Sequence, residues 1–139
     1  MKNVTVLEGA EGIKKAYELT LNANALDIVC LSGSYAAVVG TYFDRDYAPR
    51  LFGGATKTRE LLPDTAANRS DAKKKDGVKN QVRFMAKLMK SESDYMLFDD
   101  TAILVSYKLD DPFAIIIQNS EIVANLKSQF DLLWQCAGK

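Results

Sequence analysis

Three carboxylates in the second half of the chain are the residues best suited to chemistry. They are Glu92, Asp94 and Asp99, within the stretch Glu-Ser-Asp-Tyr-Met-Leu-Phe-Asp-Asp. Paired carboxylates can exchange protons in acid–base catalysis or hold Mg²⁺ or Ca²⁺. The chain has no histidine, so any mechanism that needs a histidine nucleophile, base or metal ligand is excluded.

The spacing of these carboxylates argues against one shared site. Glu92 and Asp94 fall on the same face of a strand, whereas Asp99 lies an odd number of residues further on. Side chains alternate between the two faces of a strand, so Asp99 should point the other way unless a turn rotates it. We therefore expect no metal site and no cofactor, and keep a metal-dependent hydrolase using these three residues only as an alternative.

A second group of polar residues follows the apolar run Leu26–Leu31. Ser32, Gly33, Ser34 and Tyr35 stand at its carboxyl end, which is where open α/β sheets place their ligands. If these hydroxyls meet the carboxylates, the site suits a sugar, a polyol or a cation better than a phosphate. Arginines could partly neutralise the negative charge of these carboxylates, and the candidates are Arg45, Arg50 and Arg59.

The elements that must position these residues alternate along the chain. Apolar or alternating runs predict strands at 4–7, 26–31, 58–62, 81–85, 95–98, 102–107 and 113–117. Amphipathic spacing predicts helices from Glu11 to Leu21, from Tyr35 to Leu51 with an interruption near Pro49, from Asp64 or Thr65 to Gly77, and from Asn119 or Ser120 to Trp134. This order indicates an α/β fold, a mixed β-sheet sandwiched by helices, in a single domain spanning residues 1–139.

Composition excludes several classes of function. Lysine plus arginine equals aspartate plus glutamate at 18 each, so no net charge attracts nucleic acid or an anionic membrane. No apolar run approaches the length of about 20 residues that a membrane span requires. The amino-terminal residues lack the apolar stretch of a signal peptide, and Cys30 and Cys136 have no partner at motif spacing. We therefore expect a cytoplasmic protein.

The carboxylate stretch resembles the active-site hairpin of the phospholipase D superfamily. That family carries the pattern His-x-Lys-x-x-x-x-Asp, followed by Gly-Ser, and it closes with an apolar strand and a helix. Asp99 aligns with the motif aspartate, which puts Glu92 at the histidine position and Asp94 at the lysine position. Ser106-Tyr107 stands in place of Gly-Ser. The resemblance implies one phospholipase D-like half.

The substitutions in this motif argue against an enzyme. In the superfamily the histidine attacks phosphorus and the lysine stabilises charge on the phosphoryl oxygens. Carboxylates at both positions would present anions to a phosphodiester that needs cations. We therefore expect a pseudoenzyme.

Within the superfamily the chain looks most like the sensor domain of TrmB-type transcriptional regulators. The likeness lies in Leu7–Glu18, Thr58–Arg69 and Ile117–Trp134. It implies a dimerisation domain, with homodimer partners and possible sensing of a small-molecule effector at Ser32, Ser34, Tyr35, Arg59, Glu92, Asp94 and Asp99. DNA would be bound only through a separate helix-turn-helix domain, which this sequence lacks. A protein-interaction module without a ligand is the other alternative.

Overall fold

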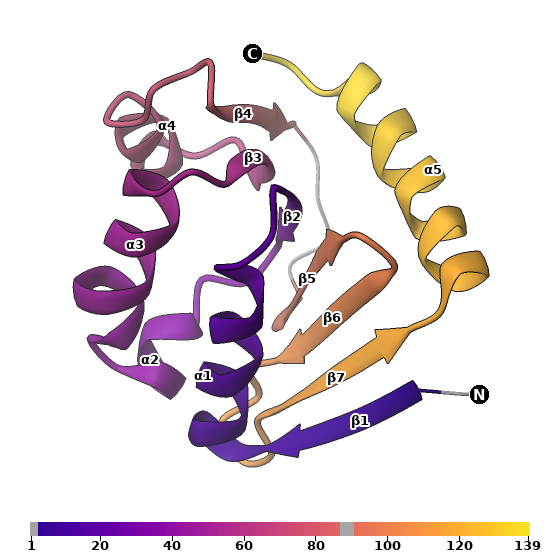
Figure 1. The fold of residues 1–139 in the computed structure, drawn as a ribbon. Coiled ribbons are helices and arrows are strands. Elements are labelled where there is room, and N and C mark those ends of the chain that lie inside the picture. Colours follow the sequence, from indigo (N-terminus) through magenta and orange to yellow (C-terminus); the bar gives the residue numbers. More distant parts are fainter. Residues whose placement is uncertain (1–2, 87–90) are drawn as a thin grey trace.

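Short apolar and β-branched runs form one mixed seven-stranded sheet in the computed structural model, which describes residues 3–86 and 91–139 (Figure 1). The strands are β1 (Asn3–Glu8), β2 (Ala25–Cys30), β3 (Lys57–Pro63), β4 (Asn80–Met85), β5 (Ser93–Phe98), β6 (Thr101–Ser106) and β7 (Phe113–Gln118). All the strands that the sequence predicts are present, with ends that differ by a few residues.

The strand order is β1-β7-β6-β5-β2-β3-β4. β2, β3 and β4 run parallel, whereas β5 runs antiparallel to β2. The carboxyl ends of the parallel strands therefore meet at one edge of the sheet, and the first residues of β5 lie beside them. Asp94 pairs with Cys30 in this register, so the topology brings the hairpin carboxylates to the loop after β2.

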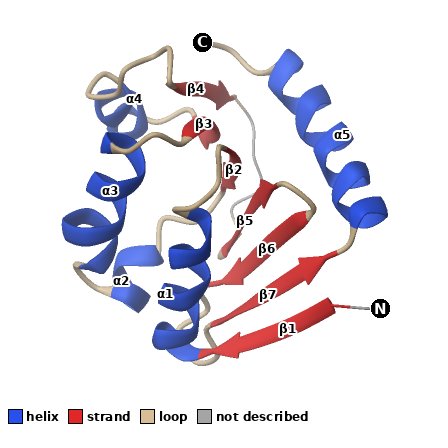
Figure 2. Ribbon diagram, viewed as in Figure 1, coloured by secondary structure: helices blue, strands red, loops and turns tan. Residues whose placement is uncertain are grey.

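Helices cover both faces of the sheet, as the sequence predicts (Figure 2). They are α1 (Gly9–Thr20), α2 (Tyr35–Val39), the π-helix η1 (Phe43–Tyr47), α3 (Ala48–Gly53), α4 (Ala66–Ala72) and α5 (Ser120–Cys136). Helices α1 to α4 lie on one side of the sheet and α5 lies on the other (Figure 1).

Each face of the sheet has its own core. Tyr17 and Tyr47 pack with Ile103 on the side of α1, whereas Phe130 and Trp134 of α5 pack with Leu97 on the other side. Because successive residues of a strand point to opposite faces, the two cores are built from alternate positions of the same strands. Neighbouring residues of one strand can therefore belong to different surfaces.

Two helix predictions are wrong in detail. The region 35–51 is not one helix broken at Pro49: the chain breaks at Gly40, whose φ is 64°, and Pro49 lies in the first turn of α3. Proline is tolerated there because the first turn needs no intrahelical N–H donor. The helix expected to continue to Gly77 ends at Ala72, so Lys74 and Lys75 lie beyond its end. Thr65 and Asn119 are helix caps, as predicted.

None of the described helices combines the length and apolar character that crossing a membrane requires.

Candidate functional site

Asp94 ties the start of β5 to the loop that follows β2. Its Oδ1 accepts hydrogen bonds from the backbone N–H groups of Leu31 at 2.8 Å and Ser32 at 2.9 Å. The Cys30 thiol donates to Oδ2 at 3.3 Å. Only 7% of Asp94 is exposed. The carboxylate that aligns with the superfamily's lysine is therefore a buried acceptor for backbone groups.

Burial sets the protonation of this cluster. Loss of solvent raises the pKa of Asp94 to about 6, although hydrogen bonds from Ser32, Cys30, Leu31 and Tyr107 oppose the shift. Burial also raises the pKa of the Cys30 thiol, and the neighbouring carboxylate raises it further. Cys30 therefore stays a neutral thiol and is not an activated nucleophile.

The hydroxyls of Tyr17 and Tyr107 bond to each other behind Asp94. Burial raises the pKa of both phenols, so both remain neutral at physiological pH. Together with Asp94 they line a small enclosed cavity of about 40 Å³, whose wall also includes Glu60. The lining of this cavity is mostly apolar, and it shares residues such as Tyr35, Phe43 and Glu60 with the larger pocket.

The larger pocket, of about 920 Å³, lies at the carboxyl ends of β2 and β3. Four of the residues singled out from the sequence line it: Ser32, Ser34, Tyr35 and Glu92. The Ser32 hydroxyl accepts a hydrogen bond from the backbone N–H of Ser34 at 2.9 Å. The predicted ligand edge of the sheet therefore holds a pocket, and these four residues are brought together in it.

Asp99 lies away from this pocket. It is exposed in the turn between β5 and β6, at the opposite end of β5 from Asp94, and its φ is 50°. Aspartate is one of the few non-glycine residues that adopt this left-handed conformation readily. Asp99 serves the hairpin turn and lies apart from the pocket-lining members of the ligand-binding set that the sequence predicts.

Arg59 also lies outside the pocket, on the α5 face of the sheet. Its guanidinium makes two bonds to Asp27, at 2.8 and 2.9 Å, and one to Asp131 at 3.0 Å. It also lies 4.9 Å from the centre of the Phe130 ring. The structure does not support the prediction that Arg59 tempers the carboxylates, because the neighbouring residue of β3, Glu60, is the one that faces the pocket.

Sequence reasoning missed the charged centre of the pocket. The Lys75 ammonium lies 2.5 Å from Oε1 of Glu60, with side-chain exposures of 15% and 9%. The ammonium also lies 4.2 Å from the centre of the Phe52 ring. Burial raises the pKa of Glu60, and the charge of Lys75 opposes that shift. The available signal was a glutamate followed by Leu61 and Leu62 within a predicted strand, together with the later lysine run.

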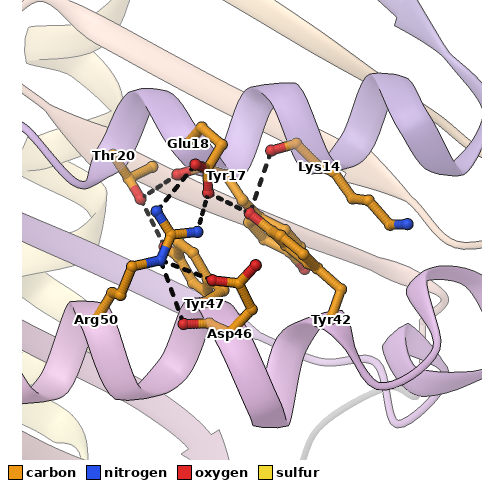
Figure 3. Close-up of polar contacts among 8 residues, drawn as sticks. All are labelled: Lys14, Tyr17, Glu18, Thr20, Tyr42, Asp46, Tyr47 and Arg50. Carbon is orange, nitrogen blue, oxygen red and sulfur yellow. Dashed lines mark hydrogen bonds and ion pairs between the residues drawn. The ribbon is translucent and has the colours of Figure 1, made fainter.

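The helical wall of the pocket is anchored to α1 by polar contacts, drawn in Figure 3. Arg50 makes a two-point contact with Glu18, at 2.9 and 2.6 Å, and the Tyr42 hydroxyl donates to the same carboxylate at 2.5 Å. The hydroxyls of Thr20 and Tyr47 lie 2.6 Å apart. Arg50 is therefore used to hold η1 and α3 against α1, and not to neutralise the hairpin carboxylates.

Within residues 3–86 and 91–139, no group of three or more histidine, cysteine, aspartate or glutamate side chains is placed to hold a metal ion. The described carboxylates of the pocket reach it from separate elements. Asp44 comes from η1, Glu60 from β3 and Asp71 from α4. The arrangement therefore offers dispersed hydrogen-bonding groups to a ligand.

Comparisons with known proteins place this fold among solved structures. No protein-family model and no curated protein sequence matches the chain. The structure is similar to TrmBL2, an archaeal chromatin protein described as having a novel mode of DNA binding, with a TM-score of 0.67 and 19% identity over 98% of this chain. The match covers 54% of TrmBL2, so this chain spans about half its length.

Phospholipase D-type proteins of similar length are also close in structure. NucT from Helicobacter pylori has a TM-score of 0.66 at 10% identity, covering 99% of each chain. Nuc from Salmonella typhimurium, a phospholipase D family member, has a TM-score of 0.63 at 10% identity, covering 99% of this chain and 97% of that one. The chain therefore has a phospholipase D-like fold related to that of TrmB-type proteins.

Proposed function

We propose that the chain is a non-catalytic, cytoplasmic domain of a transcriptional regulator that pairs with itself and senses a small polar molecule. One observation carries the non-catalytic assignment. The positions that align with the catalytic histidine and lysine hold Glu92 and Asp94, and the Asp94 carboxylate is enclosed by backbone donors. A carboxylate in that setting cannot stabilise negative charge on a phosphoryl group.

The large pocket supports the sensing role. Its lining combines hydroxyl, amide and carboxylate groups with the aromatic side chains of Tyr35, Phe43 and Phe52. Its volume of about 920 Å³ falls within the usual range for small-molecule sites, about 300–1,000 Å³. Such a lining suits a sugar or polyol, whose hydroxyls bond to the polar groups while its carbon face lies on the rings.

Self-pairing is supported by the free edge of the sheet. Among the described strands β1 pairs with β7 alone, and its Val4 and Val6 are exposed at 61% and 55%. An exposed edge strand with apolar side chains is a ready surface for another strand. Two-fold symmetric pairing is also the commonest arrangement of protein oligomers. We propose that DNA is contacted through a separate helix-turn-helix domain.

The alternative of an interaction module without a ligand is favoured by one observation. The outer face of α5 exposes Leu132 at 64% and Leu133 at 42%, in addition to the apolar edge of β1. Exposed apolar groups of this kind mark association surfaces. That module would bind a protein partner and leave the pocket empty.

A thermal-shift screen distinguishes a ligand-sensing domain from an interaction module without a ligand. Neutral sugars and polyols, nucleotides, simple phosphodiesters and divalent cations are each added to the protein, and to Glu92→Ala as a pocket-rim variant. Since a ligand that binds only the folded state raises its stability, we expect a shift with neutral polyols and none with phosphodiesters. No shift with any class, from a protein that sediments as a dimer, would favour the interaction module.

A further inference from the structure

We infer that the outer edge of β4 is a second association edge for another copy of this chain, and that residues 137–139, the capping segment, keep this edge closed. The inference goes beyond the proposed function, which involves the large pocket and the edge of β1. It concerns the other side of the sheet, where β4 is the last strand in the order.

The capping segment is hydrogen-bonded to β4. The Phe84 N–H donates to the carbonyl oxygen of Gly138 at 2.7 Å, and the Gly138 N–H donates to the carbonyl oxygen of Phe84 at 3.0 Å. The two residues form an antiparallel bridge outside the seven strands. Figure 1 shows the chain beyond α5 turning toward the β4 side of the sheet. The outer edge of β4 therefore accepts an extended segment of chain.

The polar groups of β4 alternate in direction along the strand. In a parallel ladder, alternate residues direct both polar groups to the partner strand and the residues between them direct theirs away. The carbonyl oxygen of Met85 accepts from the N–H of Asp64, directly after β3, at 3.2 Å, whereas the polar groups of Phe84 point away from β3. The N–H and carbonyl of Val82 therefore point outward too. Within the described chain, these two groups have no hydrogen-bond partner.

The positions on either side of Val82 are already occupied. The carbonyl oxygen of Asn80 accepts from the Gly77 N–H at 3.1 Å, and Phe84 is bonded to Gly138. An edge strand that is covered in this way is protected from pairing with another chain. Release of the capping segment would leave Val82 and Phe84 as two successive open positions, where a ladder can begin.

The last turn of α5 positions the capping segment. Arg83 of β4 donates to the carbonyl oxygen of Trp134 at 2.6 Å, and its guanidinium lies 4.6 Å from the centre of the Trp134 ring. The last carbonyls of a helix have no intrahelical partner, so Arg83 satisfies one of them and joins α5 to β4. A substitution at Gly138 can therefore release the bridge while these contacts hold α5 in place.

The edge of β4 is complementary to itself. A two-fold axis at Val82 would place Val82 opposite the same residue of the second copy, and Phe84 opposite Asn80. Arg83 would then lie opposite Gln81, so no like charges would meet across the pair. Such two-fold contacts are the commonest in protein oligomers. A second copy is therefore the occupant that fits this edge.

Sedimentation velocity over a range of concentrations tests the inference. Gly138→Pro removes the N–H that bonds to Phe84, and Ala137, with φ −80° and ψ 148°, already has the backbone that a residue before proline prefers. Gly138→Ala is the matched control, since it keeps the N–H and its Cβ would lie 4.0 Å from the nearest atom, the Phe84 carbonyl oxygen. At the highest concentration we expect Gly138→Pro to reach at least double the wild-type mass, and Gly138→Ala to match the wild type.

A second substitution identifies the edge that associates. Proline is tolerated in an edge strand where the N–H points away from the ladder, so Val82→Pro should block pairing at β4 and keep the bonds to β3. Val82→Pro alone should sediment as the wild type does, and the double variant Gly138→Pro, Val82→Pro should return to the wild-type mass. Association of the double variant would overturn the assignment to β4.

Hydrogen exchange of the Phe84 amide in dilute protein reports whether the edge has opened. Exchange should be at least tenfold faster in Gly138→Pro than in the wild type. Unchanged exchange would show that Gly138 does not close the edge, and faster exchange without a gain in mass would show that the open edge does not associate. Either result would overturn the inference. A wild-type monomer would contradict self-pairing at β1 alone, because this test compares Gly138→Pro with the wild type.

Discussion

At the scale of single residues, the site is decided by where each carboxylate lies. Glu92 is exposed at the rim of the large pocket, Asp94 is enclosed behind it, and Asp99 serves a turn at the other end of β5. A phosphodiester at the carboxyl ends of β2 and β3 would lie beside carboxylates, and beside backbone N–H groups that already donate to Asp94. Glu60 and Lys75, which also line the pocket, come from another strand and another loop.

The protonation of Asp94 predicts a pH-dependent stability. Its pKa is about 6 in the folded protein against an ordinary value of 3.8. A raised folded pKa means that its contribution to the free energy of unfolding is full below the unfolded pKa and is lost as the pH rises through about 6. Asp94→Asn, which stays neutral, should be more stable than the wild type at pH 7.5 by about 1–3 kcal/mol.

Urea unfolding of the wild type and Asp94→Asn between pH 4 and 8 checks this expectation. The gap in unfolding free energy should close toward pH 4, and Asp100→Asn in the exposed turn serves as the control. A variant that is less stable than the wild type across the whole range would mean that the charged carboxylate is the stabilising form.

Gly12 sets how closely α1 approaches β1. A Cβ at this position would lie 2.5 Å from the carbonyl carbon of Leu7 and 2.6 Å from its oxygen. Gly12→Ala should therefore force the helix away from the strand and lower the free energy of unfolding by about 1–3 kcal/mol. Gly33→Ala is the matched control, since a Cβ there meets nothing within 4 Å. Equal stability of the two variants in urea unfolding would refute the close approach.

At the scale of elements, adjacent residues of β3 make contacts on opposite faces of the sheet. Arg59 faces α5 and the adjacent Glu60 faces the pocket. The first joins β2, β3 and α5 through Asp27 and Asp131, and the second joins β3 to the segment after α4. Stability of the α5 face and ligand recognition should therefore respond to different substitutions on this one strand.

Arg59→Lys tests that division. Lysine keeps the charge but loses the planar two-point contact with Asp27 and the stacking on Phe130. We expect the free energy of unfolding to fall by about 1–2 kcal/mol, with sugar affinity unchanged. A large loss of sugar affinity in a folded Arg59→Lys protein would show that Arg59 contributes to ligand binding, as the sequence predicts.

At the scale of the whole molecule, the fold was largely predictable and the site only in part. The stretch 26–31, apolar except for Asp27, and the apolar run 113–117 are typical of strands covered on both faces, and both lie inside the sheet. Neighbours on a strand such as Arg59 and Glu60 face opposite ways, and nothing local in their sequence says which of them faces the pocket. The Glu60–Lys75 contact depends on how α4 and its following turn fold back over β3, which is a tertiary effect.

The free edge of the sheet predicts how copies associate. A lysine in place of Val6 would put a charge on the exposed edge of β1, a common way for proteins to prevent strand pairing. We expect sedimentation velocity to show a dimer for the wild type and a monomer for Val6→Lys. Val78→Lys is the control, because Val78 is 80% exposed but lies outside the strands. A dimer that persists in Val6→Lys would exclude β1 as the contact.

The most direct test of the non-catalytic assignment is hydrolysis of a chromogenic phosphodiester, bis(p-nitrophenyl) phosphate. The wild-type protein is incubated with EDTA and, separately, with Mg²⁺, Ca²⁺ or Zn²⁺, beside Glu92→Gln and Asp94→Asn. Carboxylates at the histidine and lysine positions predict release of nitrophenol no faster than in buffer under every condition. Turnover by the wild-type protein that either substitution abolishes would contradict the account and make these carboxylates catalytic.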